Sequence, residues 1–247
     1  MWVDTHCHLQ LDDRDPAELL DRAPDVSWLV APGVDVASSA TGEKLSLAHP
    51  GRVRWSAGLH PHDADQWSQQ GDAIAEMATR AAAVGECGLD FYRNLSPRDA
   101  QLVAFHEQLE LASSLGKPII VHCRDAFADV FASLDAILGG PQVVLHCWTG
   151  GPKWSRRFLD LGVTFSFAGP VAFETGDTVR RGAAVIPPER VMVETDTPYL
   201  SPPPFRSEPN EPARVSLVGA SLAEVWELPI NEVARLSTAR ATEVFGS

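Results

Sequence analysis

Residues 81–123, AAAVGECGLDFYRNLSPRDAQLVAFHEQLELASSLGKPIIVHC, contain the alternation that decides the fold. The apolar runs at its two ends, AAAVGECGLD and KPIIVHC, are typical of buried strands. The segment between them has one apolar stripe at helical spacing, formed by Leu102, Phe105, Leu109, Ala112 and Leu115. We expect Ser96 to cap this helix, Pro97 to begin it and Gly116 to end it. The stretch therefore predicts a strand, a helix and a parallel strand.

The same alternation extends over the rest of the chain. Apolar runs of strand length recur at 1–6, 26–33, 52–62, 81–90, 117–123, 142–151, 163–169 and 190–196. Amphipathic segments are expected at about 34–49, 72–81, 96–117, 125–138, 152–161, 174–186, 210–227 and 230–245. This pattern predicts an α/β fold, a TIM (β/α)₈ barrel of parallel strands with an outer helical ring. We expect one domain, 1–247, with the Pro-rich stretch 197–212 as a loop after the last strand.

Composition limits the partners and the location. The net charge of −13 disfavours long polyanions, so a nucleic acid would have to be gripped locally. The chain has no apolar run of membrane-spanning length, no signal-peptide pattern, no C-x-x-C pair and no Gly-rich phosphate-binding motif. We expect a cytoplasmic protein with no membrane partner and no nucleotide cofactor, and the sequence leads to no prediction of an oligomer.

Polar side chains gather where the expected strands end, which is where (β/α)₈ barrels place their active sites. Six of the eight histidines fall there, at His6, His8, His60, His62, His122 and His146. Acidic residues end the fourth and eighth strands, at Glu86, Asp90, Glu194 and Asp196. We therefore expect these side chains to converge at one mouth of the barrel.

The His6-x-His8 pair is the first sign of a metal site. Residues i and i+2 of a strand point the same way, with Cα atoms about 6.6 Å apart, so both imidazoles can reach one cation. A pair of hydrogen-bonded core histidines is the alternative, and it weakens once the other donors are added. Because the donor set exceeds what one ion requires, we expect two divalent ions of Zn, Mn or Mg, with Glu86 as the bridging carboxylate.

The positions of the cysteines and lysines disfavour two other kinds of metal ligand, thiolates and a carbamylated lysine. The cysteines lie one residue past expected ligands, at Cys7, Cys87, Cys123 and Cys147. On a strand they would face away from those ligands as small buried hydrophobes, which disfavours the alternative of a thiolate zinc site. The lysines fall away from the strand ends, at Lys44, Lys117 and Lys153, so a carbamylated lysine is not expected to bridge.

Five motifs occur in order: DTHCHL (4–9), GLHPHDA (58–64), the long stretch 85–126, LHCWTGG (145–151) and ETDTPYLSP (194–202). Together they resemble the TatD-type metal-dependent deoxyribonucleases, from Asp4 to about Val215 and on into the helical tail. The resemblance implies a metal-dependent hydrolase that cleaves phosphodiester bonds at DNA 3′ ends, a 3′–5′ exonuclease using a water activated by two metals.

The resemblance also implies roles for individual residues. One ion would be held by His6, His8 and Asp196, the second by His122 and His146, and Glu86 would bridge them. Asp196 would also be the general base, and His60 would contact the scissile phosphate or the leaving group. Arg124 and Arg206 would bind substrate, although Arg124 fits equally well as a solvated arginine or a partner of Asp125. His62 and Glu194 are expected to support the ligands.

One stretch departs from the family pattern R-G-K-R-N-E-P. In FRSEPNEP (205–212), Ser207, Glu208 and Pro209 stand where Gly, Lys and Arg are expected. Two cations are lost and one anion is gained beside the expected substrate path. We therefore expect DNA ends or short single-stranded oligonucleotides as partners, or a different phosphoester.

Three alternatives remain open at this point. The same site could deacylate D-aminoacyl-tRNA, which assays on that substrate and on oligonucleotides would separate. A three-metal barrel phosphoesterase also begins D-x-H-x-H, but ETDTPYL fits it poorly. A binding or scaffold protein with a relic site should have lost a ligand, and none of the six is missing.

Overall fold

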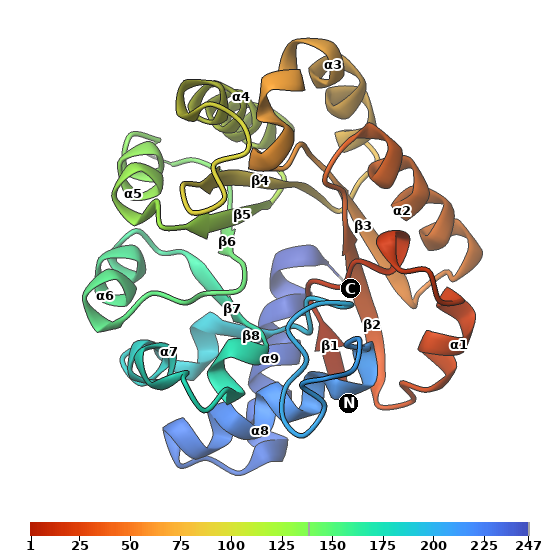
Figure 1. The fold of residues 1–247 in the computed structure, drawn as a ribbon, viewed down its shortest axis with the longest axis vertical. Helices are drawn as coiled ribbons and strands as arrows, with labels where there is room; N and C mark the ends of the chain where they lie inside the picture. Colours follow the sequence, from red (N-terminus) through yellow and green to blue (C-terminus); the bar gives the residue numbers. More distant parts are fainter. Residues whose placement is uncertain (138, 247) are drawn as a thin grey trace.

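The computed structural model describes residues 1–137 and 139–246, and over them eight strands form one sheet in sequence order (Figure 1). Neighbouring strands are parallel throughout this order. They are β1 (Trp2–Asp4), β2 (Val26–Pro32), β3 (Val53–Ala57), β4 (Ala83–Asp90), β5 (Ile119–Arg124), β6 (Val143–Leu145), β7 (Thr164–Phe167) and β8 (Val191–Val193). The predicted barrel of parallel strands is confirmed.

Helices surround this sheet (Figure 1). They are α1 (Pro16–Asp21), α2 (Val36–Ala48), α3 (Trp67–Ala78), α4 (Arg98–Leu115), α5 (Phe127–Asp135), α6 (Pro152–Asp160), α7 (Asp177–Ala183), α8 (Val215–Trp226) and α9 (Ile230–Phe245). Helix α1 was not expected from the sequence, and α3 begins five residues before the expected start at residue 72. The segment expected at 125–138 ends on residue 138, which lies outside the described residues. The Pro-rich stretch is a loop until the 3₁₀ turn at Pro212–Arg214, as predicted.

The ends of α4 test the capping predictions. Gly116 ends the helix in the left-handed conformation, with φ 61°, as expected. Ser96 does not cap it, because the Ser96 hydroxyl donates instead to the His62 carbonyl at 2.8 Å. Pro97, expected as the first helical residue, occupies the N-cap position. Ser96 therefore bonds to the His62 carbonyl outside the helix instead of capping α4, and it anchors the loop that carries His62.

Hydrogen bonds join β8 to β1 and close the ring. The backbone N–H of Thr5 donates to Val193 O at 3.1 Å, and that of Asp196 donates to His6 O at 2.9 Å. Cys7 and Thr197 add a parallel bridge just beyond the two strands. Since β1 ends at Asp4, the expectation that His6 and His8 lie within the first strand is wrong. They follow it, and the bridge to the end of β8 holds them.

Strand alternation separates the interior of the barrel from its outer layer. Ile120 and Val144 pack in the interior cluster, whereas Val121 and Leu145 pack under the helices. His122 and His146 come two residues after the interior positions, so they continue the inward-facing row. The end of α9 contributes Val244 to the same interior cluster, and this helix lies toward the middle of the ring in Figure 1. The end of α9 therefore packs at one end of the barrel, and the polar residues lie at the other end.

Within the described residues, no helix has both the length and the apolar character needed to cross a membrane.

Candidate metal centre

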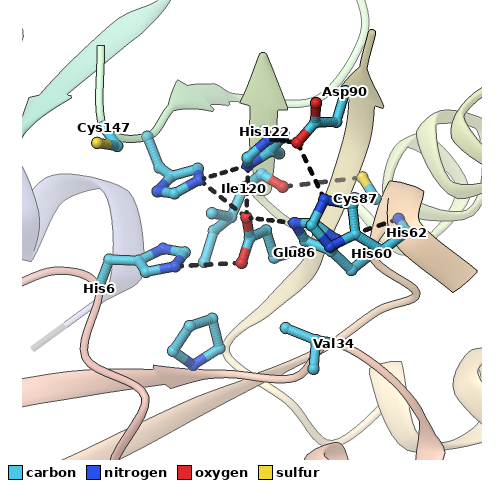
Figure 2. A network of polar contacts seen from close by, with 12 residues as sticks. His6, Val34, His60, His62, Glu86, Cys87, Asp90, Ile120, His122 and Cys147 are labelled. Carbon is cyan, nitrogen blue, oxygen red and sulfur yellow. Dashed lines mark hydrogen bonds and ion pairs between the residues drawn. The ribbon is translucent and has the colours of Figure 1, made fainter. Parts of the chain in front are cut away.

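Glu86 occupies the middle of the polar cluster, and Figure 2 shows imidazoles approaching it from several sides. Its side chain is almost completely buried, at 3% exposure. One carboxylate oxygen, Oε1, lies 2.8 Å from His146 Nε2, 3.0 Å from His122 Nδ1 and 3.3 Å from His60 Nε2. The other oxygen, Oε2, lies 3.2 Å from His6 Nε2 and 3.6 Å from His8 Nε2. Its two oxygens therefore face two different sets of nitrogen donors.

Asp196 approaches the same cluster from the end of β8. Its Oδ1 lies 3.5 Å from His8 Nε2 and 3.8 Å from His6 Nε2. The two imidazole nitrogens are themselves 3.1 Å apart. Asp196 has φ 58°, so the chain turns sharply here and directs the carboxylate toward β1. The six expected ligands thus come from five separated parts of the chain to one site.

The separations fit ligands that share a cation. Donors held 2.0–2.1 Å from a tetrahedral ion are about 3.3 Å apart, which matches the distances in this cluster. Three groups bring their donor atoms within 4.8 Å of one another: His6 with His8 and Glu86, His6 with His146 and Asp196, and His60 with Glu86 and His122. The donor chemistry, imidazole nitrogen and carboxylate oxygen, is that of a divalent metal site.

Electrostatics at the centre favour positive charge. Burial would raise the pKa of Glu86, but the imidazoles of His146, His60 and His6 hold it well below its usual range. Burial would likewise lower the pKa of His146, yet Glu86 and Glu194 raise it well above the ordinary histidine value. The ionised carboxylates stabilise a proton on His146, and the same potential would stabilise a metal ion.

Two acidic side chains contact histidines that are expected as ligands, on the ring nitrogens that face away from Glu86. His146 Nδ1 lies 3.3 Å from Glu194 Oε1, and His122 Nε2 lies 3.3 Å from Asp90 Oδ2. A carboxylate accepts, so each ring donates from that nitrogen, and its other nitrogen faces Glu86. Glu194 thus contacts an expected ligand, His146, and its supporting role stays a prediction. Asp90 was placed at a strand end by the sequence, but its role was not recognised.

His60 differs from these rings. The backbone N–H of His62 donates to His60 Nδ1 at 3.2 Å. Burial, although opposed by Glu86, lowers the pKa of His60 to about 4, so the ring is neutral near pH 7. Its proton then lies on Nε2, facing the cluster, which suits a hydrogen-bond donor better than a ligand. His62 itself contacts Asp90 Oδ2 at 3.0 Å rather than an expected ligand.

The two expected substrate arginines lie outside the cluster. Arg124 is exposed, with its guanidinium 4.1 Å from the ring centre of Tyr92. Arg206 is also exposed; its guanidinium covers Phe173 at 3.7 Å and donates to Ser201 O at 2.7 Å. Arg124 is the last residue of β5 and Arg206 lies in the loop after β8, and the contacts named here join neither arginine to an expected ligand.

The cysteines take no part in the donor groups. Cys7 and Cys87 are fully buried in apolar clusters, and Cys123 packs against one of them. All four thiols, including that of Cys147, are free. Lys117 is equally remote, because its ammonium binds the backbone carbonyls that follow α3. The central position among the imidazoles is therefore occupied by Glu86, and Lys117 lies away from it.

A (β/α)₈ barrel with this donor set at the strand ends defines a metal-dependent hydrolase. The family model for TatD related DNases matches residues 3–246, and the chain belongs to this family. The metal-dependent hydrolase YabD of Bacillus subtilis is 33% identical, with 99% of each chain covered. The 3′-5′ ssDNA/RNA exonuclease TatD of a Rahnella species is 38% identical, with 81% of each chain covered.

Solved structures agree with the family. The crystal structure of YJJV, a TatD homologue from Escherichia coli, superimposes with a TM-score of 0.89 at 25% sequence identity. That match covers 100% of this chain and 98% of the other. The expected fold, enzyme class and family are thus confirmed.

Proposed function

We propose that this chain is a two-metal 3′–5′ exonuclease that shortens single-stranded DNA or RNA. The observation that carries the proposal is the position of Glu86, with each carboxylate oxygen facing its own set of imidazoles. A carboxylate so placed can bridge two divalent ions, for which Zn, Mn and Mg are the candidates. One ion would be held by His6, His8 and Asp196 and the other by His122 and His146, with Glu86 shared.

Bound divalent ions would supply Lewis-acid activation of water and neutralise phosphate charge. Asp196, whose side chain remains 13% exposed, accepts the proton of the attacking water. Burial would raise the pKa of Asp196, but His8 and His6 face this carboxylate and hold its pKa below the usual range. The carboxylate is therefore ionised near pH 7. His60 donates from Nε2 to the scissile phosphate or the leaving oxygen.

The substrate proposal draws on the relatives and on charge. Several relatives are named 3′-5′ ssDNA/RNA exonucleases. A net charge of −13 disfavours a long duplex, whereas a strand end needs cations only at the cleaved phosphate. Arg124 and Arg206 would add local positive charge at the mouth. Residues 1–247 would act as one hydrolase domain, and the free cysteines favour a reducing compartment such as the cytoplasm.

An activity panel tests this proposal. Purified enzyme is given single-stranded DNA, duplex DNA, RNA and D-aminoacyl-tRNA, each with Mg²⁺, Mn²⁺ or Zn²⁺, while bound metal is counted by mass spectrometry. We expect nucleotides to leave the 3′ ends of single strands and about two ions per chain. Glu86→Gln and Asp196→Asn should abolish this release and keep the far-ultraviolet circular dichroism of the wild type. Faster hydrolysis of D-aminoacyl-tRNA than of oligonucleotides, or full activity in either variant, would overturn the proposal.

A further inference from the structure

Both tyrosines of the chain are exposed close to the metal centre. Tyr92 is 62% exposed and Tyr199 is 54% exposed. Tyr92 is the second residue after β4, and Tyr199 is the third residue after Asp196. Each ring is therefore carried by a loop at the carboxyl end of a barrel strand, where the polar cluster opens to solvent.

Tyr199 lies next to His8 and Asp196. Its backbone N–H donates to the Asp196 carbonyl at 2.8 Å. The ring centre lies 6.1 Å from that of His8, with the two planes inclined by 70°. This T-shaped contact leaves more than half of the tyrosine exposed.

Tyr92 stands on the side of His122 and Asp90. Its backbone N–H donates to Asp90 Oδ1 at 3.0 Å, and the same carboxylate contacts His122 through Oδ2. The Arg124 guanidinium lies over the ring at 4.1 Å, which places a positive charge against one aromatic face. Glu86 contacts His122 through one oxygen and His8 through the other. Tyr92 binds the carboxylate that contacts His122, and Tyr199 contacts His8, so the two tyrosines are linked to different oxygens of Glu86.

Exposed aromatic rings beside a nucleic-acid site can bind unpaired bases. Bases of single strands stack on such rings, whatever their sequence, whereas paired bases in a duplex have no free face. Rings this exposed contribute little buried area to folding, so packing does not explain them. The net charge of −13 works against binding through phosphates alone, which makes apolar contacts to the bases more valuable.

We propose that Tyr92 and Tyr199 are two base-stacking subsites that hold the nucleotides on either side of the scissile phosphate. They favour single-stranded ends because each needs an unpaired base. This inference rests on the proposed exonuclease function and adds the residues that select the strand.

Binding measurements on the metal-loaded enzyme test the subsites. The ligand is a fluorescent single strand with phosphorothioate linkages at its 3′ end, so that it resists cleavage, and fluorescence anisotropy gives Kd. A second strand carries abasic sites at its two terminal nucleotides. We expect Tyr92→Leu and Tyr199→Leu each to weaken binding of the normal strand about tenfold. Tyr→Phe variants should bind as the wild type does, and the abasic strand should bind the Leu variants and the wild type equally.

Leu47→Ala is the matched control. Leu47 is 77% exposed and lies at the carboxyl end of α2, the end that leads to the start of β3 and so away from the mouth. It should leave Kd unchanged. Equal affinity of the Leu variants and the wild type for the normal strand would overturn the subsites while the exonuclease proposal stands. A wild type that releases no nucleotide from single strands would instead overturn the proposed function, and the inference with it.

Discussion

At the scale of single residues, Asp90 contacts both His62 and His122, and His122 is an expected metal ligand. Its Oδ2 lies 3.0 Å from His62 Nε2 and 3.3 Å from His122 Nε2. Its Oδ1 accepts the backbone N–H groups of Tyr92 and Arg93 at 3.0 and 2.8 Å. Burial would raise the pKa of Asp90, but these partners hold it below its usual range, so the carboxylate is ionised near neutral pH. It can therefore fix the ring of His122 before any ion binds.

We expect Asp90→Asn to weaken metal binding by about tenfold or more, because an amide no longer polarises the His122 ring. Titration calorimetry with Mn²⁺ or Zn²⁺ measures this directly. Glu110→Gln, an exposed position on α4, is the control and should bind metal as the wild type does. Unchanged affinity in Asp90→Asn would show that this carboxylate does not position the ligand.

At the scale of elements, β4 and β5 approach each other unusually closely at Gly88. Gly88 has φ 132°, a conformation that side chains rarely adopt. A Cβ atom at this position would lie 2.1 Å from the His122 carbonyl oxygen. Gly88, the second glycine of the motif GECGLD, is therefore needed to bring β4, which carries Glu86, against β5, which carries His122.

Gly88→Ala should destabilise the protein by about 3 kcal/mol or more, since backbone strain adds to a steric clash. Denaturant unfolding measures the change. Gly51→Ala is the matched control, because Gly51 also has a positive φ, 77°, yet nothing lies within 4 Å of its Cβ position. A cost no greater than that of Gly51→Ala would contradict the close-approach argument.

Lys117 ties the turn after α3 to the start of β5. Its Nζ donates to the carbonyls of Ala78 and Thr79, at 2.7 and 2.8 Å. Lys117→Met should cost about 1.5–3 kcal/mol, the usual worth of hydrogen bonds to a charged group. Thermal unfolding measures this loss, and Lys44→Met, which changes an exposed lysine, should leave the midpoint near that of the wild type. Catalytic rates well below the melting temperature should be unaffected, because Lys117 lies away from the metal centre.

At the scale of the whole molecule, the closure of the barrel holds the metal centre together. Asp4 accepts from the Thr195 backbone N–H at 2.9 Å and from its hydroxyl at 2.6 Å, which joins the end of β1 to the end of β8. His6 follows one of these strands and Asp196 the other. An ion held by both would therefore act as one more link across the closing seam.

Removal of metal should lower the melting temperature. A ligand at about 100 times its Kd stabilises the folded state by about 2.7 kcal/mol, which corresponds to several degrees for a chain of this size. Calorimetry with and without a chelator measures the shift, and readdition of the ion should restore it. Asp196→Asn should show a smaller shift. A midpoint that ignores the chelator in the wild type would contradict a role for the ion at the seam.

The sequence by itself determined the strand order, the barrel and which polar side chains gather at its mouth. Apolar runs mark the strands because a parallel sheet is buried on both faces, and His122 or His146 could be placed because strand side chains alternate. The sequence placed the ends of helices less accurately. Ser96 illustrates this, because its hydroxyl bonds to a carbonyl that only the tertiary fold brings close.

Only the tertiary structure decided which donors share a carboxylate oxygen and which nitrogen each ring presents. Asp90, Glu86 and His122 lie on two neighbouring strands, and their contacts depend on a register that local pattern does not specify. His6 and His8 converge with Asp196 because β8 closes on β1, a pairing between the two ends of the sheet order. Distances between side chains follow from such long-range pairings, and these form only when the whole barrel does.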